Sequence, residues 1–276
     1  MPSPTTALPT ILTPALLKSL RTHPALPLHS WYFIAGVTLS VLNRPDEIPR
    51  VFDYALEHDG RGDGEDTDGE GGAAVKGGGG GKGARGRAER LVVARRFREG
   101  LVKSAAIVGL PKTINALFSL KTATPPSLLD EPMAYSPTAR PIEIADVPPS
   151  QILLRGQRFF DRVYGKVSKR VMGQMDRSGT EDLGLTARLM YGYLLSNTSV
   201  LSAAESSFVL LAGLIPQDVN PQLKGHLKGA LNNGATVEEV KAVREVVISI
   251  CEAFGMKRLG EDAPQGWGWR GEIANL

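Results

Sequence analysis

A single histidine in the second half of the chain has the type and position for acid/base chemistry. His226 lies in the segment NPQLKGHLKGALN, residues 220–232, where Asn220-Pro221 predicts the start of a helix. At helical spacing it falls near Leu223 and Ala230, on or beside the apolar stripe that must face the core. An unperturbed imidazole titrates near neutral pH, as a general acid/base requires. Position alone favours the alternative, a core histidine whose ring nitrogens bond to backbone carbonyls.

Two other polar side chains could act together with His226. Gln222 lies one helical turn before it, and we expect it on the same inward face, where it could bind a substrate. Glu205 is the third helical residue after Ser202, which forms an S-x-x-E capping box. A capping role alone would explain that carboxylate, so spacing leaves its function open.

The segment around His226 carries a family resemblance. The run QLKGHLKGALNNGATVEEV, followed by an apolar helix ending at Gly255, resembles the carboxymuconolactone decarboxylase and AhpD-like family. The resemblance covers the second half well and the first half more weakly. It implies an all-α fold, an AhpD-like helical bundle, and a homo-oligomer, because members of this family are usually oligomeric.

The resemblance also assigns roles to the polar residues. In AhpD-like proteins a Glu at the start of one helix and a His on the next form a proton relay to a C-x-x-C pair. Glu205 would orient the imidazole of His226, which would act as general acid/base, but Gln222 and Val219 occupy the two cysteine positions. The implied activity is lyase chemistry, decarboxylation or proton transfer on a small organic acid or lactone, with no metal and no cofactor.

Two other classes of function remain as alternatives. A non-catalytic oligomer could bind a small-molecule ligand or act as a scaffold and keep the fold without chemistry. A thiol hydroperoxide reductase is the least favoured, because Cys251 is the one cysteine and has no resolving partner. Three tyrosines could line a pocket near the relay, but aromatic residues at helical spacing favour packing: Tyr164, Tyr191 and Tyr193.

Composition excludes several classes of protein. The chain has 276 residues, of which 42% are hydrophobic, enough for a substantial soluble core. The longest apolar stretch, residues 31–42, is too short to span a bilayer, so we expect no membrane partner. A net charge of +3 with dispersed basic residues argues against nucleic-acid binding. A single cysteine excludes an internal disulfide and favours an intracellular protein.

The last three residues predict a location. Ala274-Asn275-Leu276 has the small, polar, leucine order of a relaxed SKL-type peroxisomal address, with Asn in place of the usual basic residue. The predicted partner is then the peroxisomal import receptor, bound through this C-terminus. The alternative is an ordinary frayed end and a cytoplasmic protein.

The chain is predicted to be one all-helical domain of two duplicated halves. The first half is 1–123 and contains a disordered Gly-rich insertion at 58–89, and the second half is 151–276 after an extended Pro-rich linker at 124–150. Aligning Ala55-Leu56 with Ala230-Leu231, and Gly109 with Gly255, brings the two halves into register. Val51 then corresponds to His226, so the fold itself does not require an imidazole there.

Cap and breaker residues give the expected helices. Thr13-Pro14, Ser202 and Thr236 mark helix starts, and Gly234 and Gly255 mark helix ends. The expected helices run from Pro14 to about 20, 31 to 42, 47 to 56, 90 to 108, one turn after Pro111, one long helix after Ser150 to 175, 183 to 195, and three helices that open at Ser202, Asn220 and Thr236.

Overall fold

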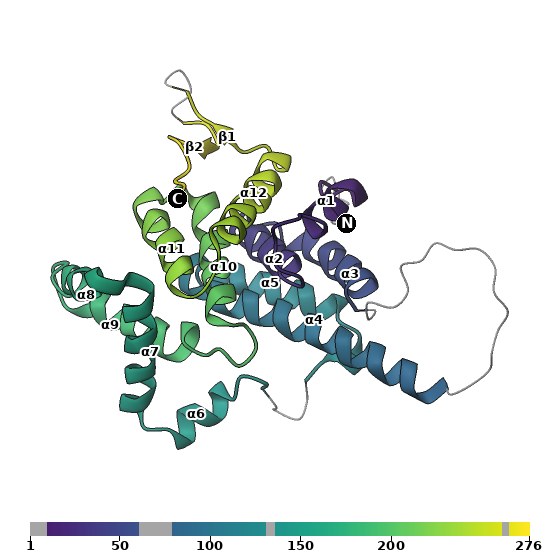
Figure 1. The fold of residues 1–276 in the computed structure, drawn as a ribbon, viewed down its shortest axis with the longest axis horizontal. Helices are drawn as coiled ribbons and strands as arrows, with labels where there is room; N and C mark the ends of the chain where they lie inside the picture. The colour runs from purple at the N-terminus through teal and green to yellow at the C-terminus, as the bar shows by residue number, and fades with distance from the viewer. Residues whose placement is uncertain (1–9, 61–78, 131–135, 261–264) are drawn as a thin grey trace, which may run out of the picture.

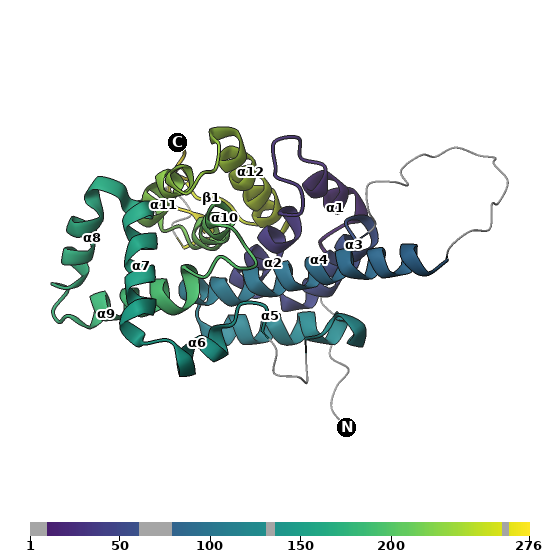
Figure 2. The same ribbon diagram turned by 60° about the horizontal axis from the view of Figure 1, so that its bottom comes forward.

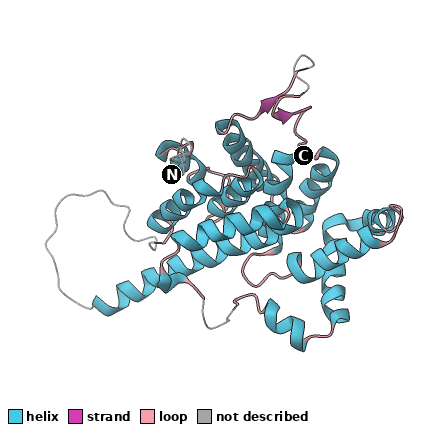
Figure 3. Ribbon diagram, turned by 180° about the vertical axis from the view of Figure 1, so that it is seen from behind, coloured by secondary structure: helices cyan, strands magenta, loops and turns pink. Residues whose placement is uncertain are grey.

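The computed structural model describes residues 10–60, 79–130, 136–260 and 265–276, and these form the predicted all-α fold. Figure 3 shows helices throughout this part of the chain and one short pair of parallel strands. The α-helices and strands are α1 (Pro14–Arg21), α2 (Trp31–Val41), α3 (Ile48–His58), α4 (Gly79–Val108), α5 (Leu110–Ala123), α6 (Arg140–Asp146), α7 (Pro149–Tyr164), α8 (Ser168–Met175), α9 (Asp182–Leu189), α10 (Ala203–Leu214), α11 (Asn220–Asn232), α12 (Val237–Ala253), β1 (Lys257–Arg258) and β2 (Gly268–Trp269). Short 3-10 turns lie at Pro45–Glu47, Pro126–Leu128, Gly165–Val167 and Ile215–Gln217, and a π-helix at Met190–Leu195.

The core is built around α2, whose every residue is buried. A helix that is apolar on all sides is stable only when neighbours enclose it. Helices α4, α10 and α12 pack against it, together with α3 and α5 (Figure 1). Figure 2 shows α4 and α5 lying side by side below α10 and α12. None of the helices in the described ranges is both long and apolar enough to cross a membrane.

Two glycines allow α2 and α4 to pack closely. A Cβ on Gly36 of α2 would lie 2.3 Å from Phe97 Cε1, and a Cβ on Gly100 of α4 would lie 2.9 Å from Phe33 Cβ. On each helix, therefore, a phenylalanine side chain packs directly against a glycine of the other helix. This reciprocal fit fixes how the first half packs.

A second, smaller core lies between α7, the π-helix and α10. It contains Phe159 and Phe160 of α7, Tyr191 and Leu195 of the π-helix, and Leu210 of α10. In Figure 1 helices α7 to α9 form an arm that meets the main bundle beside α11. This junction holds His226.

Local signals placed two helix starts and two helix ends in the second half correctly. Ser202 with Glu205 and Thr236 with Glu239 both form complete capping boxes. Gly234 and Gly255 end their helices with φ of +100° and +86°, the left-handed region that glycine enters without steric cost.

Two predictions on the first half were wrong. Helix α4 already includes residues 79–89, which were expected to belong to the disordered insertion; residues 61–78 of that insertion lie outside the described residues. Alanine, arginine and glutamate in residues 84–90 favour the helical state, so they can extend a helix whose later turns are packed in the core. After Gly109 the chain forms α5, 14 residues long rather than one turn, because Pro111 occupies the first turn, where no backbone donor is needed.

The linker and the arm also differ from expectation. The linker 124–150 contains a 3-10 turn and α6, and α7 starts at Pro149 instead of being capped by Ser150. The expected long helix is divided at Gly165, where φ is +54°, and the helix expected over 183–195 becomes α9 followed by the π-helix. Residue spacing alone does not distinguish a π turn from an α turn.

The two halves follow the same element order. A buried helix, a 3-10 turn and two further helices occur as α2 to α4 and again as α10 to α12. Gly109 and Gly255, aligned in the sequence, both follow the last helix of their set with positive φ. This order agrees with the duplication, which stays a prediction.

Candidate functional site

His226 is buried and has one free ring nitrogen. Its side chain is 6% exposed on α11, and its Nε2 lies 3.3 Å from the Tyr164 hydroxyl oxygen. Its Nδ1 is buried without a hydrogen-bond partner among the described residues. Burial lowers the pKa of His226 to about 4, so the imidazole is neutral at neutral pH. It is therefore an uncharged group with one unused acceptor or donor.

Two tyrosines extend inward from this histidine. Tyr164 is the last residue of α7 and packs on Phe160 at a ring distance of 4.5 Å, while Phe160 meets Tyr191 of the π-helix edge-on at 4.8 Å. Burial raises the pKa of the Tyr164 hydroxyl, although its interaction with Tyr191 lowers it in part. Burial also raises the pKa of Tyr191 well above its ordinary value. The aromatic cluster thus carries no charge.

Local packing explains why these residues meet. Asn232 near the end of α11 donates from Nδ2 to the Val163 carbonyl oxygen at 3.0 Å, and Gly229 leaves room for the Val163 side chain. These contacts bring the end of α7 onto the later turns of α11. The π-helix supplies Tyr191, and such turns are frequent at functional sites.

Glu205 has other partners than His226. Its carboxylate accepts hydrogen bonds from Arg96 of α4 and, at 2.8 Å, from the Ser202 backbone N–H. Burial raises the pKa of Glu205, but the hydrogen bonds and charge of Arg96 outweigh this and hold it below its usual range. No hydrogen bond joins Glu205 to His226 in the part of the chain that the structure describes. Its contacts therefore favour the capping role.

Gln222 does not share the burial of His226. The sequence placed both on one inward face, but Gln222 is exposed in the first turn of α11. The end of α7 covers only the later turns of this helix, through Gly229 and Asn232. The expected inward position of Gln222 was wrong for that reason, and a substrate-binding role stays a prediction.

The sequence interpretation left out two polar residues of this region. Tyr164 was interpreted as packing, and Lys103 was not singled out although it interrupts the apolar run LVKSAAIVG. Lys103 is fully buried, and its Nζ donates to the Leu195 and Asn197 carbonyls at 2.9 and 2.6 Å and to Ser206 Oγ at 2.6 Å. Burial lowers its pKa to about 7. It fastens the end of the π-helix to α4.

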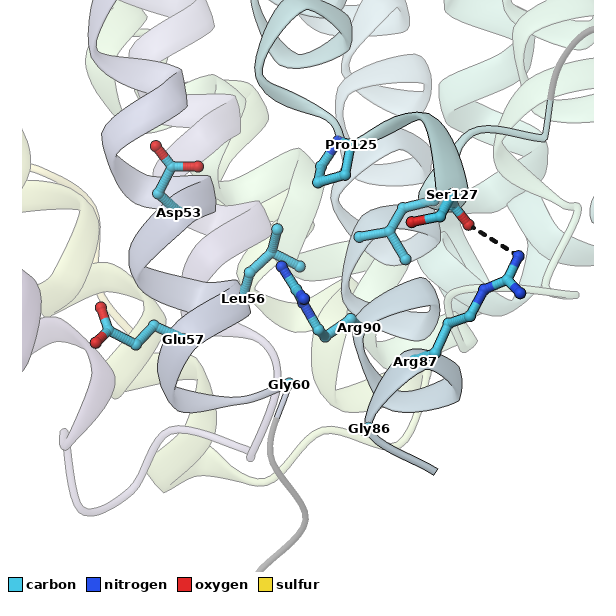
Figure 4. Close-up of a pocket in the computed structure, with 10 residues that line it drawn as sticks. Asp53, Leu56, Glu57, Gly60, Gly86, Arg87, Arg90, Pro125 and Ser127 are labelled. Atoms are coloured by element: carbon cyan, nitrogen blue, oxygen red, sulfur yellow. Dashed lines mark hydrogen bonds between the residues drawn. The ribbon is translucent and has the colours of Figure 1, made fainter. Parts of the chain in front are cut away.

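Three surface cavities have volumes suited to small molecules, and none is lined by His226 or Glu205. The largest, about 630 Å³, has Asp53 and Glu57 of α3 on one wall and Arg87 and Arg90 of α4 on the other (Figure 4). A second cavity, of about 380 Å³, is lined by Arg95, Arg98, Glu99, Val102, Asp130, Ser136, Pro137, Thr138, Arg140, Pro141 and Val200. A third, of about 430 Å³, is lined by Arg155, Arg158, Phe159, Arg162, Ser196, Thr198, Ser202 and Ala203.

The described residues offer few side chains for metal binding or thiol chemistry. No cluster of three or more His, Cys, Asp or Glu side chains there could hold a metal ion. Cys251 is buried, and burial raises the pKa of its thiol, so the reactive thiolate is disfavoured.

Known proteins place this all-helical chain among peroxisomal proteins. It is 35% identical over 230 residues to peroxisomal protein 2 of Schizosaccharomyces pombe, covering 83% of this chain and 89% of the relative. It is 31% identical over 266 residues to peroxisomal protein 2 of Saccharomyces cerevisiae, covering 87% of this chain and 94% of the relative. No protein-family model and no solved structure matches the chain significantly.

The chain belongs to the peroxisomal protein 2 family, and it is a peroxisomal protein. The location predicted from the sequence is confirmed, whereas the targeting role of Ala274-Asn275-Leu276 stays a prediction.

Proposed function

We propose that this protein performs cofactor-free acid/base chemistry on a small organic acid or lactone, in the manner of carboxymuconolactone decarboxylase. The observation that carries the proposal is the buried, neutral His226, whose Nδ1 has no partner among the described residues while Nε2 contacts the Tyr164 hydroxyl. A buried polar atom without a partner is costly, and it persists where a ligand can satisfy it. The resemblance of residues 222–240 to that family supports the same residue.

The chemistry follows from how an anion changes the histidine. In this proposal a carboxylate bound beside His226 raises the pKa of the imidazole from about 4 toward neutral pH, and substrate binding thereby favours the protonated ring. When the bond from carbon to the carboxylate breaks, the electron pair stays on the substrate carbon and carbon dioxide leaves. The imidazolium then transfers its proton to that carbon, so each turnover consumes one proton and the histidine returns to its neutral form.

In this proposal Tyr164 positions His226, and Glu205 stabilises the helix start. The Tyr164 hydroxyl can hold Nε2 and leave Nδ1 facing the reacting group. Glu205, already held by Arg96 and by the Ser202 N–H, orients α10. The direct Glu/His relay that the resemblance implies is thus replaced by a Tyr/His pair.

The second candidate is a non-catalytic ligand-binding protein. It is favoured by the fact that the three cavities described above lie away from His226. Such a protein would bind small molecules there without turnover. Catalysis and binding predict different behaviour of His226 variants.

The test uses γ-carboxymuconolactone as the probe and measures carbon dioxide release. Wild-type protein should release it above the buffer rate, His226→Gln should lower the rate at least about a hundredfold, and Tyr164→Phe should lower it less. His23→Gln, which changes a histidine paired with Glu245, is the control and should stay within about twofold. Equal rates for wild type and His226→Gln would contradict catalysis by His226. Binding of the probe without turnover would favour the second candidate.

We propose that the last three residues are the import address. The Ala274 N–H donates to Asn220 Oδ1 at 2.8 Å and its carbonyl accepts from Arg244 Nε at 3.0 Å, while Leu276 is 43% exposed. A fluorescent protein fused before the chain should appear in puncta, and removal of Leu276 should release it to the cytosol. Arg244→Ala should free the tail and leave import intact or improved. Uniform cytosolic signal from the intact fusion would contradict this route.

We also propose a homo-oligomer formed through α5. Leu110, Ile114 and Phe118 recur every four residues on this helix and are 66%, 46% and 66% exposed. An apolar stripe of this kind is commonly buried by a symmetric partner. Light scattering should show a mass above the 29.6 kDa of one chain, and Phe118→Lys should reduce it, whereas Leu28→Lys in a loop should not. A wild-type mass of one chain at micromolar concentration would contradict the oligomer.

A further inference from the structure

The cavity of about 430 Å³ beside α7 has an unusual charge balance. Its eight lining residues include three arginines, Arg155, Arg158 and Arg162, and no carboxylate. The other two cavities place carboxylates of the chain next to their arginines, such as Asp53 and Asp130. Here the positive wall lacks a counter-charge among the lining residues.

The arginines lie on one face of α7. Arg155, Arg158 and Arg162 are spaced by three and four residues, so their side chains project from successive turns of the same side. Like charges at this spacing destabilise a helix. The arrangement therefore has a small cost that its surroundings must offset.

Of these three arginines, only Arg155 has a carboxylate partner among the described residues. Arg155 forms two hydrogen bonds to the Glu143 carboxylate, at 2.7 and 2.9 Å, and a third to Ser196 Oγ at 3.1 Å. Arg158 and Arg162 are exposed and have no hydrogen bond or ion pair to any described residue. Two guanidinium groups thus stand at the cavity with all their donors available.

The other lining residues include three hydroxyl groups and one aromatic ring. Ser196, Thr198 and Ser202 line the cavity from the segment that leads into α10. Phe159, only 6% exposed, also lines the cavity and packs on Tyr191. The Ser196 hydroxyl already donates to the Gly192 carbonyl at 2.8 Å, so the hydroxyls left for a ligand are those of Thr198 and Ser202. Two guanidinium groups, these hydroxyls and one apolar surface together suit a small ligand that carries several negative charges on a compact body.

We propose that this cavity binds a small polyanion through Arg158 and Arg162, with phosphate or carboxylate groups as the charged parts. The site lies on the side of α7 away from His226 and does not depend on the proposed acid/base function. A guanidinium fork matches phosphate and carboxylate oxygens in the same bidentate way, so both sources share one recognition chemistry.

Isothermal titration with pyrophosphate and with citrate tests the proposal and separates the two sources, with acetate as the singly charged reference. Wild-type protein should bind at least one polyanion in the micromolar to low millimolar range, more than about tenfold tighter than acetate, and more weakly as salt rises. The double variant Arg158→Gln/Arg162→Gln should lose at least about tenfold in affinity. The matched control Lys169→Gln/Arg170→Gln removes two exposed charges from α8 and should stay within about twofold.

A second measurement uses the wild-type protein. Phenylglyoxal modifies free guanidinium groups, and mass spectrometry should show Arg158 and Arg162 protected by the bound polyanion while Arg170 stays reactive. Any of three results would overturn the proposal. These are equal affinity in the double variant and its control, equal protection of all three arginines, and no binding of either polyanion at about 10 mM.

Discussion

The two sides of α7 have opposite characters. One side buries Phe160, Val163 and Tyr164 against α11 and the π-helix, and its polar atoms meet an uncharged histidine. The other carries Arg155, Arg158 and Arg162 beside an open cavity. In the two proposals, this one amphipathic helix separates proton chemistry, which benefits from burial, from the binding of charge, which requires access to solvent.

The largest expected difference between the two sides is in stability. Phe160→Ala removes a ring that is 1% exposed and contacts both tyrosines, so it should lower the free energy of unfolding by about 3–5 kcal/mol. Leu154→Ala on the same helix removes a side chain that is 51% exposed and should cost less than about 1 kcal/mol. Denaturant unfolding measures both. Similar losses would show that the two sides are not distinguished by packing.

The next effect is the pH dependence of stability. The pKa of His226 falls from 6.5 in the unfolded chain to about 4 in the fold, so the unfolded chain binds more protons between these values. Its contribution is complete above pH 6.5 and is lost as pH falls toward 4, by up to about 3 kcal/mol. His226→Gln should flatten this part of the curve. Parallel curves for the two proteins from pH 7 to 5 would contradict a buried neutral imidazole.

A smaller effect should follow from loss of the tyrosine hydroxyl. Tyr164→Phe leaves Nε2 of His226 without its partner while the ring packing stays, and should cost about 1–3 kcal/mol. Thermal or denaturant unfolding measures this loss. In the double variant with His226→Gln the two losses should not add, because they remove one contact. Additive losses would mean that the 3.3 Å contact contributes nothing.

The smallest effect belongs to the charged side. Arg158→Gln is exposed and has no partner among the described residues, so it should change stability by less than about 0.5 kcal/mol. Unfolding curves recorded with and without pyrophosphate would check this, since only wild type should gain stability from the ligand. A large loss without ligand would instead indicate a structural role for Arg158.

The sequence predicted those features that depend on neighbouring residues. Both capping boxes and the glycine helix ends follow from a few adjacent residues, and spacing was enough to bury His226. The contact of Tyr164 with His226 joins residues 62 positions apart and depends on the break at Gly165, which periodicity alone did not reveal. The exposure of Gln222 could not be predicted because it depends on which turns α7 covers.

The arginine side illustrates the same limit. The spacing of Arg155, Arg158 and Arg162 is visible in the sequence, but the other lining residues Ser196, Thr198 and Ser202 come from a segment some 40 residues further on. Only the fold shows that none of the described residues lining this cavity is a carboxylate. For Lys103 the signal was a lone charge in an apolar run, and its three oxygen partners come from residues 195 to 206.

The most direct test of a neutral, available His226 is nitrogen NMR of protein labelled with 15N-histidine, with His226→Gln used to assign the signal. The shifts of Nδ1 and Nε2 should remain those of one neutral tautomer from pH 7.5 down to about 5, because the pKa lies at about 4. A ring that takes up a proton with a midpoint near 6.5 would contradict the burial of His226 and the chemistry proposed for it.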